Sequence, residues 1–478
     1  MKCKRIASAI LCFILMINCS CVNVQAAKKT DSSTKITSFG KDWPKGPSID
    51  AGAAVVMDVS TGVVLYEKNG TQKNYPASIT KILTSLLALE NCNSLSEKVT
   101  FSKNAVFSIE KGSSSCAIDV GEELALQECL YGVMLESANE ISNAVAEHIS
   151  GSIEDFAELM NEKVTELGGV NSHFANANGL FDENHYTCAY DMALIASAAI
   201  RNTTFEKITS TRVYFADSKD RRGDERIWRN HHKFINKERS YDGCIGGKTG
   251  YTQRARHTLV TYAKRGNMTL VCVIMNEDGA VEQYTDTAKL LDYGFDNFTL
   301  YNTSSNGTDD FVKDVFFNKF HNVINSENPM LSMDSNSSVI LPNGVNLNQV
   351  EKKVEYSESS ANENEQLENV EVGKVVYSYE GQVVGQGKIL LNTIESELPT
   401  TIHKVVERKA NGKTASLGKV EQTADAKETK KKNLKPMIIT IIAVAVVLLI
   451  LGYYFVVERP RIRRRKAYLA RRRRRYYD

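Results

Sequence analysis

The sequence predicts an α+β protein, in which a large domain is followed by a smaller β-rich region and a C-terminal transmembrane helix. Three observations support this prediction. Strand-like apolar runs lie near both ends of residues 45–300, with helical patterns between them. Between about 301 and 400, strand-like runs prevail and helical periodicity is weak. Close to the C-terminus, one apolar segment is long enough to cross a membrane as a helix.

The large domain is predicted to begin with a β-hairpin. Apolar runs at 53–59 and 63–66 are joined by the turn sequence Ser60-Thr61-Gly62. A helix is predicted from Ser78 to Glu90, because its apolar residues recur on one stripe. Further helices are predicted at 124–136, 140–149, 153–167 and 280–293, and further strands at 258–262 and 269–275.

In the β-rich region, strands are predicted at 339–341, 370–379 and 382–391. The segment 357–369 between them is acidic and rich in Ser and Asn, so we expect a loose loop there. Two polar segments without apolar periodicity, 27–44 and 401–436, are expected to be linkers.

The N-terminus is predicted to be a signal peptide covering residues 1–26. Basic residues among the first five precede an apolar run from 6 to about 17, and Val24-Gln25-Ala26 offers small residues before a cleavage site. An uncleaved anchor helix is the alternative, although the run is shorter than the roughly 20 residues that span a bilayer. Cys19 and Cys21 lack the usual Leu-rich lipoprotein context, so we do not expect lipidation.

The C-terminus carries a second membrane signal at Met437–Val457. These 21 residues contain no charge, and as a helix they would span about 31 Å, the thickness of a hydrocarbon core. Eleven Lys or Arg residues follow between Arg459 and Arg475, and such a tail is expected to stay in the cytoplasm. We therefore expect an exported protein, anchored by a transmembrane helix at 437–457 with a cytoplasmic tail at 458–478. A buried globular helix is the alternative.

The formal net charge of +2 hides an uneven distribution. The signal peptide carries +3 and the tail carries +9, so the region between them carries about −10. This charge argues against nucleic acid as a partner of the folded domains, and the basic tail suits anionic lipid headgroups. Six of the ten cysteines follow the proposed cleavage site, and none forms a Cys-x-x-Cys pair. We therefore expect mostly buried thiols and no metal site.

Three short motifs occur in an order that suggests covalent catalysis by a serine: Ser78-Ile79-Thr80-Lys81, Ser137-Ala138-Asn139 and Lys248-Thr249-Gly250. Ser-x-x-Lys and Ser-x-Asn recur elsewhere in the chain, whereas Lys-Thr-Gly is unique. Ser78 differs from the other Ser-x-x-Lys serines because it opens an apolar helix, where free backbone N–H groups lie nearby. Lys81 would lie one turn later on the same face.

Each motif also has a structural interpretation. Ser78 could be an ordinary helix N-cap, Ser137 and Asn139 could cap the following helix, and the Lys-Thr-Gly sequence could be a turn. The joint occurrence of the three motifs favours catalysis. Some other polar residues lack the spacing of a metal site or a histidine-dependent hydrolase and are interpreted as structural, namely His173, His185, His231, His232, Asp58 and Asp191.

The segments around these motifs resemble the D-alanyl-D-alanine carboxypeptidases among the low-molecular-weight penicillin-binding proteins, a family of serine peptidases. The resemblance covers about residues 45–300, and a fainter likeness reaches about 400. It is carried by Tyr75–Thr84, Leu135–Glu140, Phe156–Asn161, Leu167–Gly169, Phe174–Leu180, His185–Ala193 and Gly243–Thr252. It implies a catalytic domain of the β-lactamase/transpeptidase type at 45–300, with an antiparallel sheet flanked by helices, and a β-rich C-terminal domain at 301–400.

The resemblance also implies the chemistry. Ser78 would attack the carbonyl between the two D-alanines of a peptidoglycan stem pentapeptide and form an acyl-enzyme. Lys81 would take the proton as a neutral amine, its pKa lowered by burial and by the charge of Lys248. Ser137 would relay a proton to the leaving D-alanine. The substrate would be bound by Asn139, Lys248, Thr249 and Gly250, and the oxyanion hole would be the backbone N–H groups of Ser78 and Tyr251.

The resemblance implies no cofactor. It implies that β-lactams acylate Ser78 stably, and that the protein acts on the cell wall and cell shape of a bacterium. The sequence departs from the family pattern at several positions. The family usually has Ser-Gly-Asn-Asp, whereas this chain has Ala138 and Glu140 in place of the Gly and the Asp. Asn178 stands where a His often precedes Gly-Leu, His232 where Asn is usual, and Arg256 where Gly is common. Arg256 and His257 follow the substrate strand, so they leave the substrate preference open.

Two other functions compete with this interpretation. A β-lactamase would need a positioned carboxylate to activate the deacylating water, and no Glu-x-x-Leu-Asn-like segment occurs between Asn139 and Lys248. A catalytically silent β-lactam sensor or wall-binding scaffold would not need the three intact motifs. The tail of about 20 residues is too short to hold a signalling domain.

Overall fold

The computed structural model describes residues 40, 42–303, 331–356 and 368–392. By internal contacts the chain divides into two units, 1–395 and 396–478, and the second lies wholly outside the described residues. The same holds for the predicted signal peptide, most of the first linker, most of the acidic loop, and the predicted transmembrane helix with its tail. Among the residues that are described, no helix is both long and apolar enough to cross a membrane.

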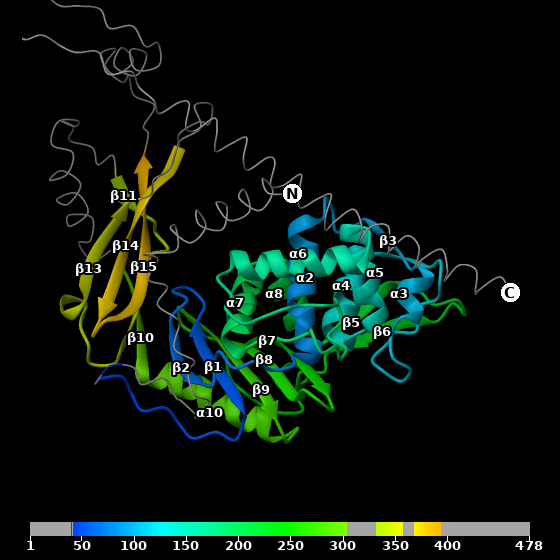
Figure 1. The fold of residues 1–478 in the computed structure, drawn as a ribbon, viewed down its shortest axis with the longest axis horizontal. Coiled ribbons are helices and arrows are strands. Elements are labelled where there is room, and N and C mark those ends of the chain that lie inside the picture. Colours follow the sequence, from blue (N-terminus) through cyan, green and yellow to red (C-terminus); the bar gives the residue numbers. More distant parts are fainter. Residues whose placement is uncertain (1–39, 41, 304–330, 357–367, 393–478) are drawn as a thin grey trace, which may run out of the picture. The chain divides into compact units, whose positions relative to one another are not determined.

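A five-stranded antiparallel sheet forms the centre of residues 42–303 (Figure 1). Its strand order is β2-β1-β9-β8-β7, with bounds Val64–Lys68, Ala53–Asp58, Met268–Glu277, Arg256–Arg265 and Cys244–Thr252. The predicted hairpin and the two later strands are confirmed. All six residues of β1 are buried, because helices cover both faces of the sheet. This explains why its sequence is continuously apolar rather than alternating.

Successive residues of the strands point into two different cores. Val55 and Val273 belong to a large apolar cluster shared with most of the helices. Val56 and Cys272 belong to a second cluster on the other face, which is covered by α10 (Glu282–Asn297). Figure 1 shows α10 on one side of the sheet and α2 and α7 on the other.

The helices of the larger side are α2 (Lys81–Asn91), α3 (Lys103–Phe107), α4 (Leu126–Tyr131), α5 (Asn139–Ser150), α6 (Ile153–Glu166), α7 (Ala189–Ile200) and α8 (Thr203–Ser210). Two small two-stranded sheets complete this part: β3 (Lys98–Thr100) with β4 (Glu123–Ala125), and the hairpin of β5 (Val213–Lys219) with β6 (Glu225–Arg229). A short helix, α9 (Lys233–Asn236), precedes β7.

The three strands predicted between 339 and 391 are also confirmed. A six-stranded antiparallel sheet is formed by β10 (Phe298–Asn302), β11 (Leu331–Met333), β12 (Ser338–Pro342), β13 (Glu351–Tyr356), β14 (Glu368–Tyr379) and β15 (Gln382–Asn392). It has an apolar cluster of its own, which includes Val339, Val375 and Ile389. A short 3₁₀ helix, η3 (Leu347–Gln349), precedes β13.

Two helix predictions need correction. The α-helix predicted from Ser78 begins only at Lys81, and residues Ala77–Thr80 form a 3₁₀ turn, η1. The helix predicted at 124–136 is divided into β4, α4 and a π-helical turn, η2 (Gly132–Glu136). The N–H of Ser137 closes this wide turn by donating to the carbonyl of Gly132. Both irregular turns lie directly beside the proposed site motifs, where such turns are common.

Candidate active site

Ser78 lies on η1, and its backbone is held in an unusual conformation. Ala77, directly before it, has a left-handed φ of 51°, which costs a non-glycine residue about 1–2 kcal/mol. Two hydrogen bonds hold the turn: the Thr80 hydroxyl donates to the carbonyl of Ala77 (2.8 Å), and the Thr258 hydroxyl donates to the carbonyl of Pro76 (2.8 Å). Strain of this kind is typical of functional sites. The N-cap interpretation of Ser78 is wrong, because η1 is capped at Pro76 without a side-chain bond.

His185 supports the same turn from behind. Its Nδ1 accepts the N–H of Ala175 (3.0 Å), so the ring proton lies on Nε2 and points to the Thr80 hydroxyl, 2.9 Å away. Burial lowers the pKa of His185 to about 3, and the ring is therefore neutral. The structural interpretation of this histidine agrees with these contacts.

Lys81 is completely buried, and its amine contacts three oxygen atoms. Its Nζ lies 3.1 Å from the Ser78 hydroxyl oxygen and 2.7 Å from Oδ1 of Asn139, and it also contacts the backbone carbonyl of Asn178. Burial and then the charge of Lys248 hold the pKa of Lys81 well below its ordinary value, against a smaller opposing effect of Glu140. Both causes expected from the sequence are present.

Ser137 and Asn139 lie where η2 ends and α5 begins. Ser137 is buried and has a left-handed φ of 62°, and Asn139 is the first residue of α5. The capping interpretation is wrong, because the N-cap is Ala138 and makes no side-chain bond, while the Asn139 side chain contacts Lys81 instead. Among the described residues, the Ser137 hydroxyl makes no direct hydrogen bond to Ser78 or Lys81.

Lys248, Thr249 and Gly250 lie in β7, so the turn interpretation is also wrong. The Lys248 side chain is 1% exposed, its Nζ donates to the carbonyl of Thr249 (3.0 Å), and burial lowers its pKa to about 7. A Cβ atom at Gly250 would lie 2.9 Å from the backbone nitrogen of Ser78. The expected close approach of this strand to Ser78 therefore occurs, and Tyr251 follows with an exposed side chain.

Asn178 was singled out in the sequence only as a departure from the family pattern, and the structure makes it a member of the site. Its carbonyl accepts from Lys81, and its side-chain amide donates to Oδ1 of Asn143 (2.8 Å). Gly179 makes this approach possible, because its φ is +85° and a Cβ there would lie 2.0 Å from the carbonyl oxygen of Ala77. The conspicuous signal was the Asn-Gly pair, which often marks a left-handed backbone position.

Glu140 is the second residue whose role the sequence did not reveal. It is 1% exposed, and its Oε1 accepts the N–H of Cys116 (2.6 Å) and the hydroxyl of Ser115 (2.8 Å). The N–H of Asn139 donates to the carbonyl of Ser114 (2.9 Å). The segment 113–117 is thus bound to the start of α5, beside Lys81.

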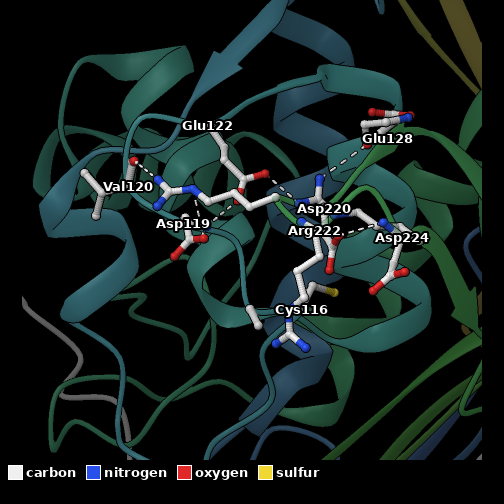
Figure 2. A network of polar contacts seen from close by, with 12 residues as sticks. Cys116, Asp119, Val120, Glu122, Glu128, Asp220, Arg222 and Asp224 are labelled. Carbon is white, nitrogen blue, oxygen red and sulfur yellow. Dashed lines mark hydrogen bonds and ion pairs between the residues drawn. The ribbon is translucent and has the colours of Figure 1, made fainter.

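The neighbouring residues 119–122 are bound to the β5–β6 hairpin (Figure 2). Arg221 of the hairpin pairs with Asp119 (3.0 Å) and donates to the carbonyl of Val120 (3.0 Å), and Arg226 pairs with the half-buried Glu122. The Asp220 carboxylate closes the hairpin turn by accepting backbone N–H groups of Arg222 and Asp224. We infer that the hairpin stabilises the loop 112–122 next to the site.

The remaining polar candidates have contacts that suit structural roles. His232 is buried behind β7, and its Nε2 lies 2.9 Å from the Thr261 hydroxyl. Asp58 accepts from Ser60 and Thr61 in the β1–β2 turn, and Asp191 accepts backbone N–H groups of the loop after α6. All six cysteines of the described part are free thiols, and no group of three or more His, Cys, Asp or Glu is arranged there to hold a metal.

Comparisons with known proteins identify the family of this chain. The family described as D-alanyl-D-alanine carboxypeptidase matches residues 41–279. The D-alanyl-D-alanine carboxypeptidase DacF of Bacillus subtilis is 32% identical over 350 residues, which are 71% of this chain and 84% of that protein. DacA of Haemophilus influenzae is 31% identical over 351 residues, 72% of this chain and 84% of that protein.

Two solved structures are similar in fold. Penicillin binding protein 5 from Haemophilus influenzae is 27% identical, with a TM-score of 0.56, and the match covers 74% of this chain and all of that one. The Streptomyces K15 DD-transpeptidase is 29% identical, with a TM-score of 0.50, over 53% of this chain and all of that one. The predicted α+β fold with antiparallel sheets is thereby confirmed, and the chain belongs to the D-alanyl-D-alanine carboxypeptidase family of serine peptidases.

Proposed function

We propose that this protein removes the terminal D-alanine from peptidoglycan stem pentapeptides, through an acyl-enzyme on Ser78, and that it binds penicillin. One observation carries the proposal: a completely buried lysine amine with a strongly lowered pKa lies 3.1 Å from the hydroxyl of a serine in a strained turn. No ordinary helix cap requires such a pair.

The contacts of Lys81 suggest how Ser78 is activated. A neutral amine has two N–H bonds and one lone pair, and two of its three neighbours, Oδ1 of Asn139 and the carbonyl of Asn178, can only accept. If these two take the N–H bonds, the lone pair faces the Ser78 hydroxyl. The amine would then accept the serine proton as the oxygen attacks the substrate carbonyl.

The other motif residues suit the remaining steps. Lys248 and the Thr249 hydroxyl would bind the terminal carboxylate of the substrate, whose charge would favour the protonated form of Lys248. The N–H groups of Ser78 and Tyr251 would stabilise the oxyanion, at about 3 kcal/mol for each donor. Ser137 would pass a proton to the leaving D-alanine, and Asn139 would hydrogen-bond the substrate backbone.

Water would then release the shortened peptide, whereas a β-lactam would stay attached. A β-lactamase needs a carboxylate free to activate water beside the acyl bond. Glu140 is the carboxylate whose charge acts on Lys81. Its Oε1 is already bonded to Ser115 and Cys116, and its Oε2 is buried away from solvent, without a hydrogen-bond partner in the described part of the chain. This arrangement favours the carboxypeptidase over the β-lactamase.

We also propose an exported enzyme in a bacterium, anchored at the outer face of the cell membrane by residues 437–457. The catalytic domain would comprise 45–300 and the β-rich domain 301–400. The support for the location is the pattern of apolar and basic segments at the two ends of the chain. Deleting 437–478 should move the protein from the membrane fraction to the medium; retention in the membrane would contradict the anchor.

The catalytic proposal is tested by fluorescent penicillin labelling together with D-alanine release from a pentapeptide. We expect stable labelling and release by the wild type, and loss of both in Ser78→Ala. Ser85→Ala is the matched control, because this buried hydroxyl lies on α2 and has no hydrogen-bond partner among the residues that the structure describes. Labelling without release would indicate a β-lactam sensor, and rapid turnover of penicillin would indicate a β-lactamase. Labelling of Ser78→Ala would refute the role of this serine.

A further inference from the structure

We propose that a pocket beyond the end of β7 binds a carboxylate of the substrate peptide, two or three residues before the scissile bond. The pocket, called here the upstream pocket, has a volume of about 480 Å³. Its lining includes Lys73, Tyr75, Glu183, Tyr186, Arg254 and Asn276. This inference rests on the proposed function, because it assumes that a peptide is bound along β7.

The direction of the bound peptide follows from the order of residues in β7. Lys248 and Thr249 suit the terminal carboxylate, and the next residue, Gly250, lies against the backbone nitrogen of Ser78, where the scissile carbonyl must be. Going from Lys248 towards Thr252 therefore leads from the C-terminus of the substrate to its preceding residues. β7 is an edge strand of the described sheet, and edge strands can pair with an extended peptide.

The distance also fits a subsite at this end. An extended peptide advances about 3.3 Å per residue, so the residues before the scissile bond would pass Tyr251 and Thr252. They would then reach the turn between β7 and β8, where Arg254 lies. Tyr251 is 58% exposed, and its ring centre lies 4.6 Å from that of His257, with the two ring planes tilted by 38°. Tyr251 therefore forms one wall of this path.

The upstream pocket starts close to the nucleophile. Tyr75 precedes Ser78 by three residues, and its ring meets Phe181 edge-on at 5.0 Å. The Arg254 guanidinium lies over the same Phe181 ring, 5.8 Å from its centre. The three side chains connect the η1 turn with the β7–β8 turn, so a peptide leaving Ser78 in this direction would meet them.

The two cations of the pocket are held by aromatic rings instead of carboxylates. Lys73 lies with its Nζ 3.8 Å above the Tyr186 ring, and Arg254 rests on Phe181. In the described part of the chain, neither cation belongs to an ion pair, whereas the nearby Arg256 pairs with Asp278 at 3.0 Å. Glu183 is the single carboxylate of the lining, so the pocket keeps a net positive charge.

This arrangement suits an anionic group better than a neutral one. A guanidinium binds a carboxylate with two parallel hydrogen bonds, and a lysine adds a point charge. The rings of Tyr186 and Phe181 keep the two cations in place, and Tyr75 lines the pocket between them and Ser78. The expected ligand is therefore a peptide with a free carboxylate before the D-Ala-D-Ala end, in preference to the same peptide with a carboxamide.

The test compares synthetic peptides that differ only in this group. Each pair ends in D-Ala-D-Ala and carries a carboxylate or a carboxamide at the second or the third residue before the scissile bond. A short N-acyl-D-Ala-D-Ala without any upstream acid is the reference substrate. The measured quantity is kcat/KM for D-alanine release by the full-length protein.

We expect the wild type to prefer the carboxylate peptide about fivefold in one of the two pairs, the upper range for an exposed ion pair. Arg254→Gln should remove most of this preference, Lys73→Gln should reduce it, and both should cleave the reference substrate at the wild-type rate. Arg256→Gln is the matched control. It removes the same charge two residues from Arg254, but from a side chain that is already paired with Asp278. The preference should also decrease as salt is added.

Equal rates on carboxylate and carboxamide peptides in the wild type would overturn the inference, and so would a preference that persists in the double variant Arg254→Gln, Lys73→Gln. With either of these results, the reference substrate would still be cleaved. Failure of the proposed function would be different, because the reference substrate itself would then not be cleaved.

Discussion

Replacing Gly179 by alanine is the most direct test of how the loop over Lys81 is built. Gly179 has a φ of +85°, and a Cβ atom there would lie 2.0 Å from the carbonyl oxygen of Ala77. The clash involves backbone, so it can be relieved only if η1 or the Asn178 loop moves. Either movement would alter the position of Ser78 or the carbonyl contact of Lys81.

The free energy of unfolding should fall by two additive amounts. The left-handed conformation costs an alanine about 1–2 kcal/mol, and the forced overpacking adds about 1–3 kcal/mol. Gly168→Ala is the matched control, because Gly168 has nearly the same φ of +84° and nothing within 4 Å of an added Cβ. Gly168→Ala should therefore lose only the free energy that the left-handed conformation costs an alanine.

Urea unfolding of the purified protein measures the stability, and the rate of acylation by fluorescent penicillin measures the site. We expect Gly179→Ala to be the less stable variant and to acylate more than tenfold more slowly, a loss of at least about 1.4 kcal/mol in the transition state. Gly168→Ala should acylate at the wild-type rate. Equal stabilities and equal acylation rates in the two variants would refute the reasoning.

The remaining predictions concern two buried charges. The pKa of Lys248 is lowered to about 7, so the unfolded state binds more protons above that pH, and stability should rise from pH 7 towards pH 10 by at most about 1.4 kcal/mol per unit. Lys248→Met should flatten this rise in urea unfolding; an unchanged slope would contradict the assignment. Glu140→Gln removes a charge that raises the pKa of Lys81, so the acidic limb of the acylation rate should move to lower pH. Glu128→Gln is the control variant. A shift of the acidic limb to higher pH in Glu140→Gln would contradict the effect assigned to the Glu140 charge.

The sequence by itself determined the chemistry and much of the secondary structure, because these depend on local spacing. Lys81 follows Ser78 by three residues, and this separation brings the two side chains together in any helical turn. The β1–β2 hairpin and the long helices α5 and α6 were also predictable, because a turn sequence or an apolar stripe specifies each one.

Other elements were not predictable from their own residues. The hairpin β5–β6 alternates weakly and depends on partners such as Glu122 and Glu128, about 90 to 105 residues away. In the same way, η2 interrupts a sequence with good helical periodicity, and Ile141 of α5 packs so closely on its Gly132 that a Cβ atom there would lie 2.6 Å from the Ile141 side chain. Tertiary packing overrode local propensity in both cases.

Only the tertiary structure decided how the motifs act on one another. Asn139 and Asn178 lie 58 and 97 residues from Lys81, yet both contact its amine, and Lys248 lowers its pKa from a different strand. Desolvation and Coulomb interactions depend on distances in space, which local sequence patterns do not contain. The residue types could therefore be recognised in the sequence, whereas the lowered pKa of Lys81 is a property of the assembled fold.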